Sequence, residues 1–197
     1  MSTRRGTPTR RAVRGERRWS LGALLVGAIA LAFVVGFVVI VVLDVREQAG
    51  STSPNGVKSF SNLSRNHTEG TVNYPQTPPV GGDHNPIWQN CGFYSKPVRN
   101  ENAVHSMEHG AVWITYRPDL PRGQVETLKN LAQSNNYVLV SSYPDLPAQV
   151  VASAWGKQLR LNSANDPRLE QFVSAYSQGP QTPEPGASCS GGVGSPE

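Results

Sequence analysis

One uninterrupted apolar segment constrains this chain more than any other feature of its sequence. Residues 21–43 contain no charged side chain and consist of Leu, Val, Ala, Ile, Gly and Phe. A helix rises about 1.5 Å per residue, so this segment is long enough to cross the roughly 30 Å hydrocarbon core of a bilayer. It lacks the polar stripe of a helix that packs on a globular domain. We therefore expect a single transmembrane helix at 21–43 that contacts the lipid bilayer.

The charges on either side of this segment predict its orientation. Residues 1–20 contain seven arginines and one acid, Glu16, whereas residues 44–47 carry a net charge of −1. By the positive-inside tendency, residues 1–20 are a cytoplasmic Arg-rich tail and the C-terminal part is extracytoplasmic. The apolar run is longer than the core of a signal peptide, and residues 47–49 make a poor cleavage site. We therefore expect an uncleaved anchor in the cell membrane.

The net charge of the chain comes from its N-terminal tail. The whole chain carries +4 and the first twenty residues carry +6, so residues 21–197 carry −2. A nucleic-acid-binding domain is normally basic, and we therefore expect no nucleic-acid partner for the extracytoplasmic part. The arginine tail more simply sets the topology and attracts anionic lipid.

Composition divides the rest of the chain into a linker, a domain and a tail. Residues 44–65 are polar and contain the Gly, Ser and Pro of a linker or stalk, and residues 180–197 form a Pro/Gly-rich C-terminal tail. We expect one folded domain at 66–179. Within it, residues 67–102 lack clear periodicity and are punctuated by Pro and Gly, which predicts a long ordered loop with a functional or binding role.

Periodicity becomes clear after residue 110 and predicts a small mixed sheet. Alternating apolar residues predict strands at 111–116, 137–143 and 149–161, the last with a bulge at Gly156. Helical spacing of apolar residues predicts helices at 122–134 and 166–178. The order strand-helix-strand-strand-helix predicts an α+β domain. Its first two strands should form a parallel crossover, and its third strand should be antiparallel to the second.

The candidate chemistry lies in the histidines. The chain has only four, and all fall within 43 residues of one another: His67, His84, His105 and His109. On a helical turn, His105 and His109 share one face and could both bind one metal ion. His84 could supply a third ligand, and His67 or Glu108 a fourth. Imidazole-rich sites suit zinc, copper or nickel, and Met107 would favour copper. We therefore predict a site for one transition-metal ion, zinc or copper.

The same stretch fits two other interpretations. His105-x-x-Glu108-His109 matches the H-x-x-E-H motif of zinc hydrolases, in which the Glu is the catalytic base and a distant acid, here Glu170 or Glu184, completes the ligands. That motif needs a long helix, whereas a glycine and a strand-like run follow here. In the other interpretation, the histidines hydrogen-bond the backbone in a module that recognises an envelope protein. We expect binding, of a metal or of such a partner, rather than catalysis.

Two cysteines, Cys91 and Cys189, follow the apolar segment. Thiols outside the cell are oxidised, so we expect these two to form a disulfide. Closing a loop of about 100 residues would stabilise the fold by up to ~4–5 kcal/mol. The alternative is that Cys91, seven residues after His84, is a thiolate ligand of the metal.

Several short strings occur in one order along the domain. They lie at 66–70 (Asn-His-Thr-Glu-Gly), Tyr74, 78–84 (Pro-Pro-Val-Gly-Gly-Asp-His), 91–94 (Cys-Gly-Phe-Tyr) and 104–112 (Val-His-Ser-Met-Glu-His-Gly-Ala-Val). Over about residues 60–190 the chain resembles domain-of-unknown-function family 3105, common in actinobacteria as single-pass membrane proteins. The resemblance implies location and domain limits but no activity. The family typically has Val-His-Asn-Leu-Glu-His-Gly, with Leu at the position of Met107. The resemblance therefore does not imply a family-wide role for the Met107 thioether.

Overall fold

The computed structural model describes residues 22, 29–40 and 53–197 of the chain. Two compact units are present, Met1–Arg46 and Glu47–Glu197. In the first, residues 29–40 are helical. Within the described residues, no helix is both long and apolar enough to cross a membrane. The predicted span at 21–43 lies partly outside the described residues.

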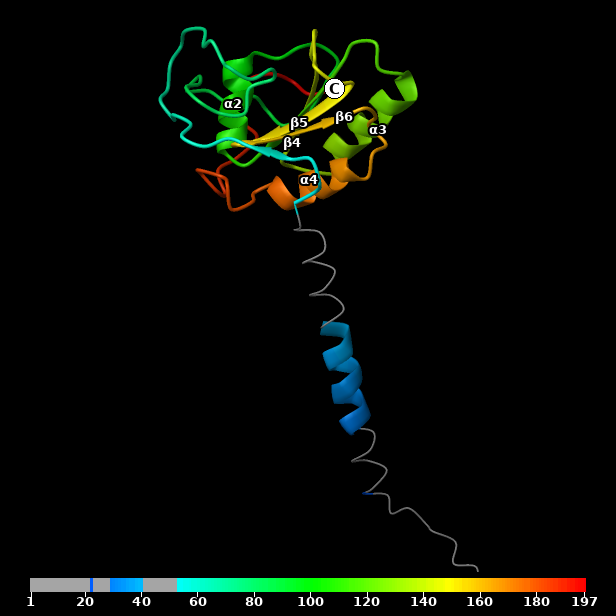
Figure 1. The fold of residues 1–197 in the computed structure, drawn as a ribbon. Coiled ribbons are helices and arrows are strands. Elements are labelled where there is room, and N and C mark those ends of the chain that lie inside the picture. The colour runs from blue at the N-terminus through cyan, green and yellow to red at the C-terminus, as the bar shows by residue number, and fades with distance from the viewer. Residues whose placement is uncertain (1–21, 23–28, 41–52) are drawn as a thin grey trace, which may run out of the picture. The chain divides into compact units, whose positions relative to one another are not determined.

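The second unit is built on a six-stranded mixed sheet, and this confirms the predicted α+β class. Figure 1 shows strands β4, β5 and β6 with the helices around them. The strands lie in the order β1-β6-β5-β3-β4-β2. Their bounds are β1 Lys58–Ser59, β2 Gly92–Tyr94, β3 Val112–Tyr116, β4 Val138–Ser142, β5 Val150–Ala154 and β6 Lys157–Leu161. The helices of this unit are α2 Asn100–Glu108, α3 Arg122–Gln133 and α4 Arg168–Tyr176.

The predicted parallel crossover is present. β3 and β4 pair in parallel from Val112↔Val138 to Tyr116↔Ser142, with α3 connecting them. β2 adds to the outer side of β4, also in parallel. β2 and β1 lie in segments predicted as a loop and a linker; each has only two or three residues, too few for alternation to be visible in the sequence.

The prediction of one strand at 149–161 is wrong in one respect. The segment forms a hairpin, β5 and β6, that turns at Trp155-Gly156 and pairs antiparallel from Val150↔Leu161 to Ala154↔Lys157. Gly156 has φ +67°, and a Cβ there would lie 2.8 Å from the carbonyl oxygen of Phe60, so the glycine marks a tight turn rather than a bulge. β5 is antiparallel as expected, but it pairs with β3.

The two faces of the sheet carry different helices. Val112 and Ile114 of β3 face a core that includes Leu128 of α3 and Phe172 of α4. Trp113 points to the opposite face, where a second core is formed with residues of α2. Each such buried side chain stabilises the fold by roughly 1.5–3 kcal/mol. α2 is therefore fixed rigidly against the sheet.

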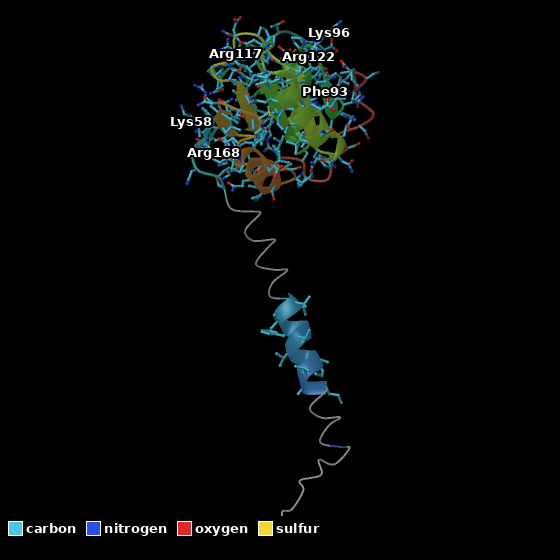
Figure 2. All side chains as sticks on the ribbon, turned by 90° about the vertical axis from the view of Figure 1, so that its right-hand side faces the viewer. Lys58, Phe93, Lys96, Arg117, Arg122 and Arg168 are labelled. Atoms are coloured by element: carbon cyan, nitrogen blue, oxygen red, sulfur yellow. A yellow bond between two sulfur atoms is a disulfide. The ribbon has the colours of Figure 1, made fainter. Side chains whose placement is uncertain are left out.

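Basic side chains are spread over the surface of this unit, as Figure 2 shows for Lys58, Lys96, Arg117, Arg122 and Arg168. They come from different elements and loops. Arg117 and Arg168 each pair with an acid two residues away, Asp119 and Asp166. The expectation that nucleic acid is not a partner stays a prediction.

Candidate metal centre

α2 presents the first part of the site. His105 and Glu108 lie in its last turn, and His109 is its C-cap, with the backbone N–H of His109 bonded to the carbonyl of His105 at 3.1 Å. Gly110 follows with φ +95°, a conformation that favours glycine and ends the helix. Eight of the nine residues of α2 are buried, so it has no exposed polar face and no visible amphipathic pattern. This is why the sequence predicted only a helical turn.

Two points in the long loop supply the other histidines. His67 and His84 face each other across an isolated parallel bridge. The N–H of Thr68 donates to the carbonyl of His84 at 2.7 Å, and the N–H of His84 donates to the carbonyl of Asn66 at 3.0 Å. This pairing positions both imidazoles beside α2.

One ligand atom from each of His67, His84, His105 and Glu108 lies within 4.8 Å of the others. An Oε2 atom of Glu108 is 2.9 Å from Nε2 of His84 and 4.0 Å from Nε2 of His67. The ligand atoms of a tetrahedral ion with bonds of about 2.1 Å lie about 3.4 Å apart, so side-chain shifts on the order of 1 Å would close this group around one ion. His84, His105 and Glu108 are buried, and His67 is half exposed.

The three buried histidines share one feature: each Nδ1 is hydrogen-bonded to a backbone carbonyl. The acceptors are Gly82 for His84 at 2.7 Å, Asn85 for His105 at 2.6 Å and Ser188 for His109 at 2.7 Å. A carbonyl only accepts, so Nδ1 carries the proton in each ring, and Nε2 carries the lone pair when the ring is neutral. Metal-binding histidines are oriented in this way.

His84 shows the consequence most clearly. Its Nε2 is buried and has no aligned hydrogen-bond partner. The Glu108 oxygen is close, at 2.9 Å, but the contact does not have hydrogen-bond geometry. A buried nitrogen lone pair next to a carboxylate is unfavourable unless a cation lies between them. The two atoms are therefore placed so that both could bind one ion.

His105 is held in its neutral form. Its pKa is lowered to about 4, chiefly by burial and also by the nearby histidines His109, His84 and His67, while the hydrogen bond to the carbonyl of Asn85 acts in the opposite direction. At neutral pH its Nε2 lone pair is therefore free of a proton and able to bind a metal ion.

His109 contacts the group through His105. Their Nε2 atoms are 2.9 Å apart, and their rings are nearly perpendicular. On its other side, Nε2 of His109 lies 3.6 Å from a carboxylate oxygen of Glu184. Trp88 packs against the His109 ring at 4.8 Å between centroids and shields this side of the cluster.

Two neighbours of these ligands have structural roles. Met107 is fully buried in the core beneath α2, so the expectation that its thioether would favour copper is wrong. Its side chain faces Trp113 and Leu139 of the sheet because it lies on the opposite side of the helix from the ligands. Ser106 donates its hydroxyl to the carbonyl of Gln89 at 2.7 Å, which ties the loop to α2.

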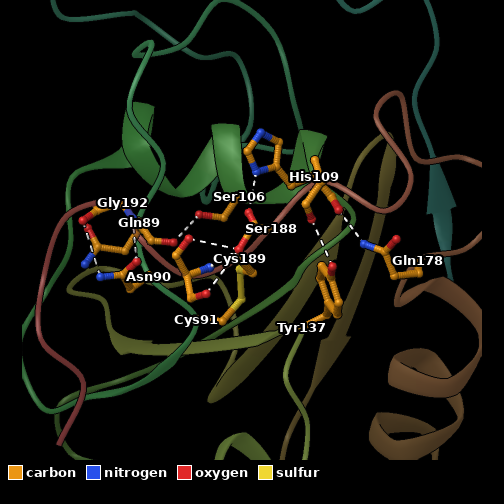
Figure 3. Close-up of a disulfide and its surroundings, with 12 residues drawn as sticks. Gln89, Asn90, Cys91, Ser106, His109, Tyr137, Gln178, Ser188, Cys189 and Gly192 are labelled. Carbon is orange, nitrogen blue, oxygen red and sulfur yellow. Dashed lines mark hydrogen bonds between the residues drawn. A yellow bond between two sulfur atoms is a disulfide. The ribbon is translucent and has the colours of Figure 1, made fainter.

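The predicted disulfide between Cys91 and Cys189 is present, with Cα atoms 5.4 Å apart, and Cys91 is therefore not a metal ligand. Figure 3 shows His109 and Ser188 beside this bridge. The N–H of Cys91 also donates to the carbonyl of Cys189 at 2.8 Å. The disulfide thus fixes the segment whose Ser188 carbonyl orients the His109 ring.

Sequence reasoning found the ligand side chains but not the groups that orient them. The carbonyls of Gly82, Asn85 and Ser188 have no signature in the sequence, because every residue has such a group. Trp88 and the buried Glu101 were also missed. Glu101 accepts from the N–H of Val72 at 2.9 Å and from Arg99 at 2.9 Å, so it supports the loop around the site.

The fold and the site define a small α+β protein with a buried histidine-carboxylate cluster and one disulfide. The chain belongs to the DUF3105 family, described as proteins of unknown function, which matches residues 66–191. No curated protein and no solved structure matches the chain. The family match confirms the resemblance inferred from the sequence and leaves the function to be argued from the site.

Proposed function

We propose that this protein binds one transition-metal ion through His67, His84, His105 and Glu108. The observation that carries the proposal is the convergence of Nε2 atoms of buried histidines whose Nδ1 atoms are all committed to backbone carbonyls. Rings arranged in this way are already oriented and desolvated before an ion binds.

The ligand set favours zinc or copper(II). Three imidazoles and one carboxylate are ligands of intermediate softness, and four such ligands match the tetrahedral preference of zinc. Met107 lies in the core, so a thioether does not bias the site towards copper(I). The carboxylate of Glu108 would neutralise one of the two charges of the ion.

We further propose that the domain is anchored by residues 21–43 and lies outside the cell membrane. The uncharged segment and the arginine-rich tail support this arrangement. The Cys91–Cys189 disulfide supports it independently, because disulfides persist in oxidising compartments. Metal handling at the cell envelope is the role most consistent with these features.

We favour metal binding over hydrolysis and over a purely structural cluster. In a hydrolase built on His105, Glu108 and His109, the glutamate would activate water, but here its carboxylate lies against His84. A cluster that only stabilised the fold would pair its buried polar atoms with hydrogen bonds, and Nε2 of His84 is not paired in this way.

The test is the metal content of the purified full-length chain. Elemental analysis after reconstitution with zinc, copper or nickel should find about one ion per chain for at least one of the three metals. The double substitution His84→Gln and His105→Gln should remove the ion, whereas Glu170→Gln, an exposed acid on α4, should retain it. Absence of metal after all three reconstitutions would refute the proposal.

A further inference from the structure

A pocket of about 400 Å³ lies where the parallel strands of the sheet end. Tyr116 is the last residue of β3 and pairs in register with Ser142, the last residue of β4, while Ser95 directly follows β2. All three line the pocket together with the first turn of α3. In open α/β sheets, ligands bind outside the carboxyl ends of the parallel strands. The histidine cluster precedes the start of β3, so this pocket is a separate site.

Two buried hydroxyl groups open into this pocket without a hydrogen-bond partner. Tyr116 is 4% exposed and Ser142 is 5% exposed. Both lie on the face of the sheet covered by α3, because Tyr116 shares a core with Leu128, and Ser142 is two residues beyond Val140 of that core. Within residues 53–197, no hydrogen bond involves either side-chain hydroxyl. Buried hydroxyls are normally paired, so these two are available to a bound molecule.

The charges at the start of α3 favour a negatively charged ligand. α3 has twelve residues, Pro121 at its N-cap, no capping side chain and no acid in its first turn. The partial positive charge of this helix end is therefore not offset locally, and the guanidinium of Arg122 adds a full positive charge. Burial, followed by the negative charge of Glu197, raises the pKa of Tyr116, so its hydroxyl remains a donor at neutral pH.

The acids around the pocket favour a carboxylate over a phosphate. The chain already binds one carboxylate beside it, because the N–H of Ser95 donates to Oε1 of Glu197 at 3.1 Å. Glu126 also lines the pocket, and a doubly charged phosphate would be repelled by it more strongly than a singly charged carboxylate. Leu120 and Val125 form an apolar part of the wall, so the ligand should also have an apolar part.

We propose that this pocket binds a small organic carboxylate. The hydroxyls of Tyr116 and Ser142 and the guanidinium of Arg122 contact its carboxylate, and Leu120 and Val125 contact its apolar part. This site is independent of the proposed metal centre, because the two share no residue and lie at opposite ends of β3.

The test compares benzoate with benzamide, which has the same ring and no charge. Saturation-transfer NMR titrations of the full-length chain in detergent should give a Kd for benzoate of about 1 mM, as expected for a ligand of this size. Benzamide should bind about tenfold more weakly, because a hydrogen bond to a charged group is stronger than one to a neutral group. Absence of benzoate binding, or equal binding of the two probes, would overturn the proposal.

The variants Tyr116→Phe and Ser142→Ala each remove one hydroxyl and should each weaken benzoate binding about tenfold. Tyr176→Phe is the matched control, because the Tyr176 hydroxyl donates to Ser53 at 2.7 Å and lies outside the pocket, so benzoate binding should stay unchanged. Urea unfolding should show no loss of stability in Tyr116→Phe, because the hydroxyl has no partner in the chain. A loss of stability with unchanged benzoate binding would show a structural hydroxyl and overturn the site.

Discussion

Hydrogen bonds from single residues decide which histidine nitrogens can bind a metal. Each carbonyl that accepts from an Nδ1 atom fixes both the tautomer and the orientation of the ring. The backbone therefore selects Nε2 in all three buried rings, although the side chains come from a loop and from α2. A ring that rotated would lose a buried hydrogen bond, which costs about 1–3 kcal/mol, so the donor atoms are already held in place.

The packing role of Met107 gives a prediction at this scale. Met107→Leu should change the free energy of unfolding by less than about 1.5 kcal/mol, because the two side chains have similar volumes and the site is apolar. Copper affinity should stay unchanged, because the thioether faces the core. Urea unfolding and a copper titration measure the two effects. A large loss of copper affinity would instead identify the sulfur as a ligand.

Among the elements, α2 and the loop before it build the site together. α2 is held against the sheet by its apolar residues, and its last turn carries His105 and Glu108. The loop returns twice to this turn, once at His67 and once at His84, which are held together by their own β-bridge. The geometry of the site therefore depends on the packing of α2 against the sheet and on the short backbone pairing between His67 and His84.

The end of α2 can be tested at Gly110. Gly110→Ala should destabilise the protein by about 1–3 kcal/mol, because its φ of +95° disfavours other residues and a Cβ would collide with the side chain of Gln178. Gly123→Ala is the matched control. Gly123 lies in α3 with open space around it, and alanine there should stabilise the helix by about 0.4–1 kcal/mol. Thermal unfolding monitored by circular dichroism measures the stability change of each variant. Equal changes in the two variants would contradict the role of Gly110 in ending α2.

The same elements show what could be predicted from the sequence. β3, α3, β4 and α4 were predicted because each has an apolar pattern that repeats at the period of its own structure. α2 was not predicted as a full helix, because it is buried on nearly every side. Its polar residues contact other parts of the protein instead of forming a solvent-exposed face. The ligand residues were visible because histidine is rare here and all four lie close in the sequence. The proximity of Glu184 to His109 depends on the path of the C-terminal segment, which local patterns do not encode.

For the molecule as a whole, the C-terminal segment completes the domain. Residues beyond α4 supply half of the disulfide, the Ser188 carbonyl and the Glu184 side chain. The N–H of Val193 also donates to the carbonyl of Trp88 at 2.9 Å, which ties this segment to the loop around the site. The segment predicted as a Pro/Gly-rich tail thus packs on the domain and contributes to the cluster.

The contribution of the crosslink can be measured directly. Replacing Cys91 and Cys189 together by Ser should lower the free energy of unfolding by about 2–5 kcal/mol, because a loop of 98 residues is no longer closed in the unfolded chain. Urea unfolding of the variant, compared with the unaltered chain before and after reduction, gives this value. The reduced unaltered chain should match the variant. An unchanged unfolding midpoint would show that the bridge contributes nothing to stability.

The disulfide also makes residues 91–189 a covalent ring. His105, Glu108, His109 and Glu184 lie within this ring, whereas His67 and His84 lie on the chain that leads into it. A protease that cuts once inside the ring, for example near the exposed Asp145, leaves two fragments that are still joined through sulfur. The four histidines and Glu108 all precede such a cut, whereas Glu184 and the Ser188 carbonyl that orients the His109 ring follow it. Cleavage alone would therefore leave the cluster assembled, and only cleavage combined with reduction would release the C-terminal segment from it.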